Sequence, residues 1–456
     1  MIKKITFNNQ IYELFRDEEI TPEENIFTIV VGKNGTGKST MLSSIVLEVL
    51  ENYNDRFYNN NEIGFRTYSQ SEIVIDSPPD NIIAVSSSPF DKFPVTRRFN
   101  DIQNYAYLGL RDLSSLNFGL SYMSKIIASL IESVHSTPSH WLNLANVLDY
   151  LGYRSEISAK FSFSMNKSEL LEIISDEVPL DVLFSNARFW GKYINRRFFV
   201  NENGEIDINK VEHLKNILIS VLNHSEYRPN KIAQIIINRD GINIESNALR
   251  LDGSHIIFLI NSGVLRLRDI GLVKKVRGSA FSIKDSSSGE QSVIISILGI
   301  ASKISNNSII CIDEPEICLH PEWQEKYIQI LITTFSTFKN CHFIIATHSP
   351  QIISNLASNN CFVVSMEDAE TTNANIFINN SIDFQLANVF KSPGFKNEYL
   401  GRIAFTIFSK VSKNKEFDSN DLLNYKILKD IFKSLVNEDP VKELISVLIE
   451  LHKKYA

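Results

Sequence analysis

The sequence predicts an α/β fold in which a mixed β-sheet with flanking helices is built from both ends of the chain. Short apolar runs typical of buried strands occur near the N-terminus and return in the last third. A glycine-rich loop joins the first run to a helical pattern, and the middle of the chain has mostly helical spacing. We therefore expect one discontinuous α/β domain (1–95 and 250–380), a mainly helical insertion (96–249) and a helical C-terminal region (381–456).

The composition is that of an ordinary globular protein. Of 456 residues, 43% are hydrophobic and 22% charged, which excludes a largely disordered chain. The formal net charge is -7, so any contact with nucleic acid must come from a local patch. No apolar run reaches the roughly 18 residues of a membrane span, and the N-terminus lacks the apolar core of a signal peptide. The four cysteines form no CxxC pair and are interpreted as buried thiols, which suits a cytoplasmic protein with no membrane segment.

The elements of the N-terminal half follow from their periodicity. Alternating apolar residues predict a hairpin over 1–15. Continuous apolar runs predict buried strands over 26–31 and 81–85, and a helical pattern lies between them at 41–50. In the insertion, apolar residues recur at helical spacing over 126–134, 142–151 and 211–222.

The C-terminal half returns to strands and then ends in helices. Strand-like segments lie at 235–238, 242–244 and 264–273, and buried strands are expected at 308–312, 343–346 and 361–366. The last 70 or so residues read as helices that begin near Gln385, Glu398, Asn420 and Asp439.

The loop after the strand at 26–31 carries the sharpest chemical signal. Its residues match the phosphate-binding P-loop pattern GxxxxGK[ST] between a strand and a helix, the context that the pattern requires. Glycines let successive backbone N–H groups face phosphate oxygens, and the helix N-terminus adds partial positive charge. We expect Lys38 to neutralise the β- and γ-phosphates of ATP and the Ser39 hydroxyl to bind Mg²⁺. The predicted nucleotide-binding residues here are Gly32, Asn34, Gly35, Gly37, Lys38, Ser39 and Thr40.

Two carboxylates follow the buried strand at 308–312. Asp313 and Glu314 stand at its carboxyl end, where an α/β sheet places its ligand crevice. Asp313 is expected to hold the Mg²⁺ shell, and Glu314 to orient and deprotonate the attacking water.

The order of the remaining motifs resembles that of the ABC-type ATPase superfamily. Ser288 and Gly289 lie in a Ser-Ser-Gly-Glu-Gln segment 25 residues before Asp313, and His348 lies 35 residues after it. The resemblance implies that two subunits stack head to tail, so that Ser288 and Gly289 contact the γ-phosphate bound by the other subunit. It also implies that His348 senses or positions this phosphate.

The segment from Asp313, which reads Asp-Glu-Pro-Glu and then Leu-His-Pro, narrows the resemblance to the OLD, RecF and AAA15 branch. Transporters of the superfamily carry Asp where His320 stands and Gly where Glu290 stands, which disfavours a transporter subunit. Segments beginning at Val85, Ser286 and Pro393 look most like the ATPases of Septu-type (PtuA-like) and retron-associated anti-phage systems.

Several positions leave alternatives open. The superfamily usually places a Gln after the strand that ends here at Val85, and Gln70 and Gln103 are both candidates for its role. Tyr12 or Phe15 could stack on adenine, or both could belong to the core. Basic residues interleaved with aromatic ones at 188–199 and 96–99 are either helix faces over a core or a nucleic-acid contact.

These observations predict an ATPase that acts as a switch or sensor in a bacterial anti-phage defence complex. It assembles as a dimer or a higher, dimer-based homo-oligomer through ATP sandwich sites and controls a separate effector. In the family it resembles, this partner is an HNH nuclease. The alternative is a RecF-like DNA-repair clamp that closes around duplex DNA when ATP binds.

Overall fold

The computed structural model describes most of the chain. The described residues are 1–53, 71–95, 104–111, 118–136, 140–175, 194–201, 204–222, 233–245, 251–276, 278, 280–317, 319–354, 356, 359–378 and 380–455. Among these residues, no helix is both long enough and apolar enough to cross a lipid bilayer.

A seven-stranded sheet forms the centre of the molecule, with strand order β15-β14-β3-β13-β12-β5-β6. Its neighbouring strands pair in parallel except for β15. In this order β3, from the N-terminal part of the chain, lies between β14 and β13 from the last third, so the two ends of the chain contribute strands to one sheet. The strands are β3 (Ile26–Val31), β5 (Ile82–Ser86), β6 (Tyr105–Leu108), β12 (Ile309–Asp313), β13 (His342–Ala346), β14 (Cys361–Ser365) and β15 (Thr371–Asn373).

Both faces of this sheet are buried, which explains its continuous apolar strands. In β3, Phe27, Ile29 and Val31 belong to one core, while Ile26 and Val30 belong to the other. Helix α1 (Lys38–Tyr53) packs in the second core with a three-stranded antiparallel sheet of β1 (Ile2–Phe7), β2 (Gln10–Glu13) and β4 (Glu72–Ile75).

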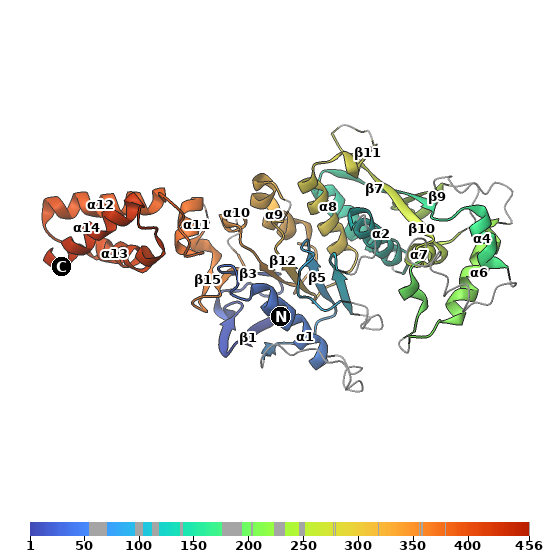
Figure 1. Cartoon of the computed structure of the whole chain (residues 1–456), viewed down its shortest axis with the longest axis horizontal. Coiled ribbons are helices and arrows are strands. Elements are labelled where there is room, and N and C mark those ends of the chain that lie inside the picture. The colour runs from blue at the N-terminus through green and yellow to red at the C-terminus, as the bar shows by residue number, and fades with distance from the viewer. Residues whose placement is uncertain are drawn as a thin grey trace.

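The other face is covered by helices that also contact a second sheet. Helices α8 (Ser288–Ala301) and α9 (Pro321–Thr334), together with α2 (Phe118–Ser136) and α3 (His140–Tyr150), share the first core. Ten of the fourteen residues of α8 are buried, so this helix is apolar nearly all round. Helices α1 and α8 therefore lie on opposite faces of the seven-stranded sheet (Figure 1).

The segment 96–249 is less helical than expected. Alongside α2, α3, α4 (Lys167–Ile174) and α6 (Ile208–Leu222) it contains two strands that the prediction omitted: β6, which belongs to the central sheet, and β7 (Tyr153–Phe163), which is eleven residues long. This strand is the middle of an antiparallel sheet ordered β11-β10-β7-β8-β9. The remaining strands are β8 (Ala233–Asn238), β9 (Gly241–Glu245), β10 (Leu265–Lys274) and β11 (Ala280–Ser282), and α7 (Gly253–Asn261) packs against β10.

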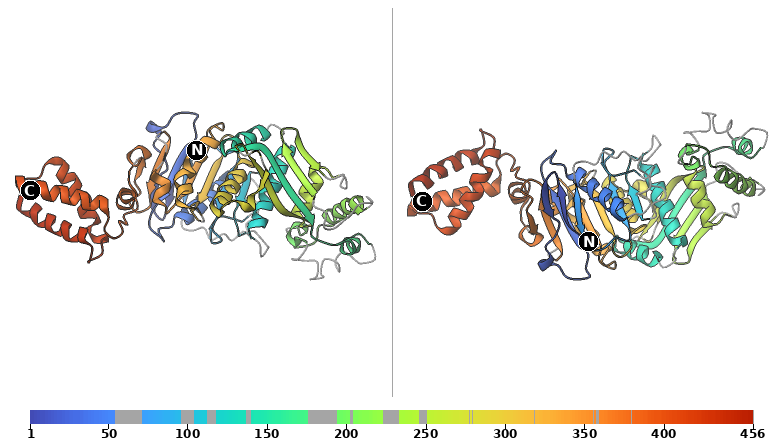
Figure 2. Two further views of the ribbon diagram at one scale, coloured as in Figure 1. Left: turned by 90° about the horizontal axis from the view of Figure 1, so that it is seen from above. Right: turned by 90° about the horizontal axis from the view of Figure 1, so that it is seen from below.

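The C-terminal helices form a third core of their own. They are α11 (Ile382–Asn388), α12 (Glu398–Asn414), α13 (Ser419–Ile431) and α14 (Pro440–Tyr455). Leu400, Ile407, Leu428, Ile445 and Leu448 are among their buried residues. The three views in Figures 1 and 2 place this bundle and the five-stranded sheet at opposite ends of the central sheet.

Candidate nucleotide site

The glycine-rich loop lies between β3 and α1, at the carboxyl ends of the parallel strands. Gly35 and Gly37 have φ of 84° and 97°, a region that side chains other than glycine seldom adopt. A methyl group on Gly37 would also lie 3.3 Å from the Phe7 ring. The loop thus has the backbone that aims N–H groups at an anion beside the N-terminus of α1.

Lys38, the first residue of α1, points back into this loop. Its ammonium donates to the carbonyl oxygens of Gly32 at 2.8 Å and Lys33 at 3.1 Å, and the residue is only 4% exposed. Burial lowers the pKa of Lys38, although nearby carboxylates such as Glu367 oppose this shift. One buried cation therefore sits in the cradle with backbone acceptors that a phosphate can replace.

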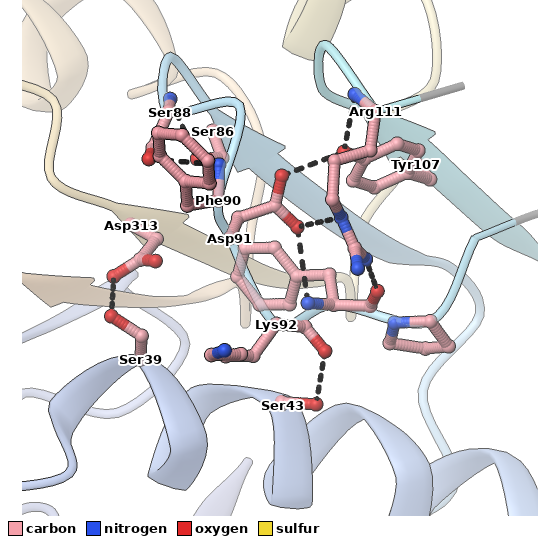
Figure 3. A network of polar contacts seen from close by, with 12 residues as sticks. Ser39, Ser43, Ser86, Ser88, Phe90, Asp91, Lys92, Tyr107, Arg111 and Asp313 are labelled. Atoms are coloured by element: carbon pink, nitrogen blue, oxygen red, sulfur yellow. Dashed lines mark hydrogen bonds and ion pairs between the residues drawn. The ribbon is translucent and has the colours of Figure 1, made fainter. Parts of the chain in front are cut away.

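Ser39 and Asp313 come together from distant parts of the sequence. The Ser39 hydroxyl donates to Asp313 Oδ1 at 3.0 Å (Figure 3), and Asp313 is 2% exposed at the end of β12. Burial raises the pKa of Asp313 to about 7, while the Ser39 hydrogen bond opposes the rise and neighbouring carboxylates add to it. A hydroxyl and a carboxylate are oxygen donors of the kind that Mg²⁺ prefers, so the pair fits this ion.

His348 lies between the lysine and the second carboxylate. Its Nδ1 is 3.2 Å from Lys38 Nζ, and its Nε2 is 3.4 Å from Glu314 Oε1. Burial, with a contribution from Lys38, lowers the pKa of His348 to about 4, so the ring is neutral at pH 7. A neutral ring that accepts from Lys38 must carry its proton on Nε2, facing Glu314. All five predicted catalytic and metal-binding side chains thus meet in one place.

Ser288 and Gly289 lie elsewhere, in the first turn of α8. Ser287 caps this helix, and Ser287 and Ser288 are exposed to solvent. Glu290 in the same turn accepts hydrogen bonds from the Tyr153 hydroxyl at 2.8 Å and the Lys274 ammonium at 3.0 Å. Burial acts to raise the pKa of Glu290, but these donors outweigh it and lower the pKa. The second sheet therefore holds the turn that carries Ser288 and Gly289, which we call the signature turn.

The loop after β5 contains a network of polar contacts that no sequence motif predicts. Asp91 is 2% exposed, accepts from the Tyr107 hydroxyl at 2.7 Å and pairs with Arg111 Nε at 3.2 Å. One residue further, the Lys92 carbonyl accepts from Ser43 of α1 at 2.7 Å, as Figure 3 shows. This loop follows the strand after which the resemblance led us to expect a glutamine. Because the network depends on partners from two other elements, local sequence carried no signal of it.

The other candidate residues are either buried in the core or lie outside the described residues. Tyr12 and Phe15 are buried, and the Phe15 ring meets the His342 ring edge-on, which favours core roles for both. The Gln70 and Gln103 candidates and most of the basic and aromatic clusters lie outside the described residues. Three cysteines are buried and free, as interpreted, and Cys318 is not among the described residues.

Comparison with known proteins identifies related chains. A family model for the AAA ATPase domain matches residues 1–353. The retron Vc95 probable ATPase of Vibrio cholerae is 26% identical over 400 residues, which cover 78% of this chain and 72% of that protein. The retron Ec83 probable ATPase of Escherichia coli is 23% identical over 376 residues, covering 74% of this chain and 66% of that protein, just under two thirds of its length.

Solved structures show a weaker likeness. An Smc head domain with an extended coiled coil, from a complex with the C-terminal domain of ScpA derived from Pyrococcus furiosus, has a TM-score of 0.27 and 14% identity. The match covers 81% of this chain and 95% of that one. The fold class rests instead on the family match and on the sheet described above.

Proposed function

Because the chain belongs to the AAA ATPase domain family and is therefore an ATPase, we propose that it is the nucleotide-driven switch of an anti-phage defence complex. Two subunits stack head to tail over ATP and Mg²⁺, and the closed dimer controls a separate effector nuclease, such as one of the HNH class. The similarity to retron probable ATPases supports the defence context.

In this proposal the loop and α1 bind the triphosphate. The Lys38 ammonium exchanges its two carbonyl acceptors for β- and γ-phosphate oxygens, which is favourable because phosphate is charged. Ser39 and Asp313 would hold Mg²⁺, which would supply positive charge at the phosphate oxygens. Glu314 orients the attacking water and takes its proton, and His348 aligns Glu314 with the γ-phosphate. The amides expected to cradle the phosphates are those of Asn34, Gly35, Gly37, Lys38, Ser39 and Thr40.

The placement of the signature turn carries the case for a sandwich. Ser288 is exposed at the N-terminus of α8, and α8 packs on the face of the sheet opposite to α1. A turn with a free hydroxyl, a glycine and helix N-terminal amides is well suited to an anion supplied by another molecule. A second copy of the chain supplies that anion when ATP occupies its own P-loop.

The Glu314→Gln variant tests the proposal because it should bind ATP without hydrolysing it. Its mass in solution, measured with and without ATP and Mg²⁺, is expected to double when nucleotide is present. The Glu314→Gln/Ser288→Arg variant is the matched control, and it should bind ATP but stay monomeric because the bulky side chain blocks the capping turn. A mass independent of ATP would contradict the sandwich.

The same variant addresses the effector. Purified from its native host with ATP, it is expected to retain a nuclease that the Ser288→Arg control does not. ATP-dependent binding to duplex DNA that weakens steeply with salt, with no protein partner, would instead favour the RecF-like clamp.

A further inference from the structure

A third carboxylate near the site has no part in the roles assigned so far. Glu316 lies two residues after Glu314, at the turn that leads from β12 toward α9. Its Oε1 accepts the backbone N–H of His348 at 2.5 Å. The contact joins residues 32 positions apart in sequence and reaches the backbone of the histidine rather than its ring.

The segment around His348 is held on both sides of the histidine. The Ser349 hydroxyl donates to Gln324 Oε1 at 2.6 Å, and Gln324 is itself fixed by donating to the Leu319 carbonyl at 2.9 Å. On the strand side, the Glu314 N–H donates to the Ala346 carbonyl at 2.9 Å. The turn after β12 and the first turns of α9 therefore clamp the loop that follows β13.

The histidine ring needs such support because its two nitrogens face groups of opposite charge. Lys38 lies at 3.2 Å from one nitrogen and Glu314 at 3.4 Å from the other. A small rotation or shift of the loop would break one contact or the other. Misplacement by about 1 Å in a catalytic arrangement costs on the order of 100-fold in rate.

We propose that Glu316 is a positioning residue that sets the place of His348 between Lys38 and Glu314 by accepting the His348 backbone N–H. The inference rests on the proposed role of His348 in ATP hydrolysis. Glu316 touches neither nucleotide nor water in this account, and it acts only through the histidine loop. Gln324 provides a second, weaker anchor for the same loop through Ser349.

The test compares three substitutions of Glu316 in the full chain by steady-state ATP hydrolysis. Glu316→Ala removes the acceptor, and Glu316→Asp keeps the charge but shortens the side chain, so both should lower kcat roughly 10- to 100-fold. Glu316→Gln keeps an acceptor oxygen and should stay within about threefold of wild type. The dissociation constant for ATP should change little in all three, which separates positioning from loss of the fold.

A double-mutant cycle with His348→Ala identifies the route of action. If Glu316 works through the histidine, the kcat of the Glu316→Ala/His348→Ala protein should lie within about twofold of the kcat of His348→Ala alone. Glu322→Ala, at an exposed glutamate in α9, is the control and should match wild type.

Three results would overturn the inference: unchanged kcat in Glu316→Ala and Glu316→Asp, an additive double mutant, or Glu316→Gln as slow as Glu316→Ala. Failure of the proposed function looks different, because then His348→Ala itself would leave the rate unchanged.

Discussion

We expect the buried Asp313 carboxylate to lower the stability of the nucleotide-free protein, because burial makes its ionisation unfavourable in the folded state. It is 2% exposed, and its pKa of about 7 stands well above the ordinary value of 3.8. The folded protein therefore holds this proton up to about pH 7, whereas the unfolded chain releases it near pH 4. Stability must fall as pH rises between these values and level off above them.

The size of the effect follows from the same pKa. At 1.36 kcal/mol per pH unit, the rise from 3.8 to about 7 corresponds to about 4 kcal/mol of ionisation cost above pH 7. At pH 5 less than half of this cost applies. Asp313→Asn keeps an oxygen for the Ser39 hydroxyl but cannot ionise, so it should remove this cost.

The assay is thermal unfolding of wild type and Asp313→Asn at pH 5, 6, 7 and 8, with a chelator and no nucleotide. At about 2 °C per kcal/mol for a large domain, the variant should melt roughly 8 °C higher at pH 8 and about 3 °C higher at pH 5. With ATP and Mg²⁺ the order should reverse, since only wild type gains binding energy. The exposed Asp368→Asn is the control. A variant that melts lower than wild type at pH 8, or with a gap that does not grow with pH, would refute the reasoning.

Three further substitutions separate the parts of the site. Glu290→Ala removes the acceptor of two hydrogen bonds from the second sheet. ATP-driven association, measured by light scattering, should therefore weaken roughly tenfold. The control Glu212→Ala, on α6, should leave this association unchanged. Gly37→Ala forces a side chain to φ 97° beside an aromatic ring, so ATP binding measured by calorimetry should weaken at least tenfold. The control Gly152→Ala, at φ 81° with open space around the new methyl group, should lose only about 1 kcal/mol of stability and bind ATP like wild type. Asp91→Asn leaves an arginine without its counter-charge and should lower the melting temperature by about 5 °C.

The central strands could be predicted closely because each is a short apolar run buried on both faces. The run at 26–31 corresponds to β3, and the run at 308–312 is shifted by one residue from β12. The P-loop and the paired acids were equally visible, since their chemistry depends on residues close in sequence. Strand β7 was missed although Ile157, Ala159 and Phe161 alternate with polar residues, because helical patterns on both sides dominated the segment.

The supporting contacts could not be predicted, because they join distant residues. The hydrogen bond between Glu316 and the His348 N–H and the ion pair between Asp91 and Arg111 depend on how strands and loops meet in space. Neither residue belongs to a pattern with its partner. The opposite placement of α1 and α8 likewise follows from sheet order, which motif spacing does not encode. The division of the chain into a discontinuous head, an insertion and a C-terminal region stays a prediction.

A complementation measurement tests most directly whether each active site is shared by two subunits. Lys38→Ala destroys the P-loop and leaves the signature turn intact, whereas Ser288→Arg does the opposite. Each variant alone should be inactive. Mixed in equal amounts, they should recover part of the wild-type ATPase rate, because a heterodimer contains one complete site, built from the P-loop of the Ser288→Arg subunit and the signature turn of the Lys38→Ala subunit. A mixture as inactive as its components, although the two proteins associate, would contradict a site built from both subunits.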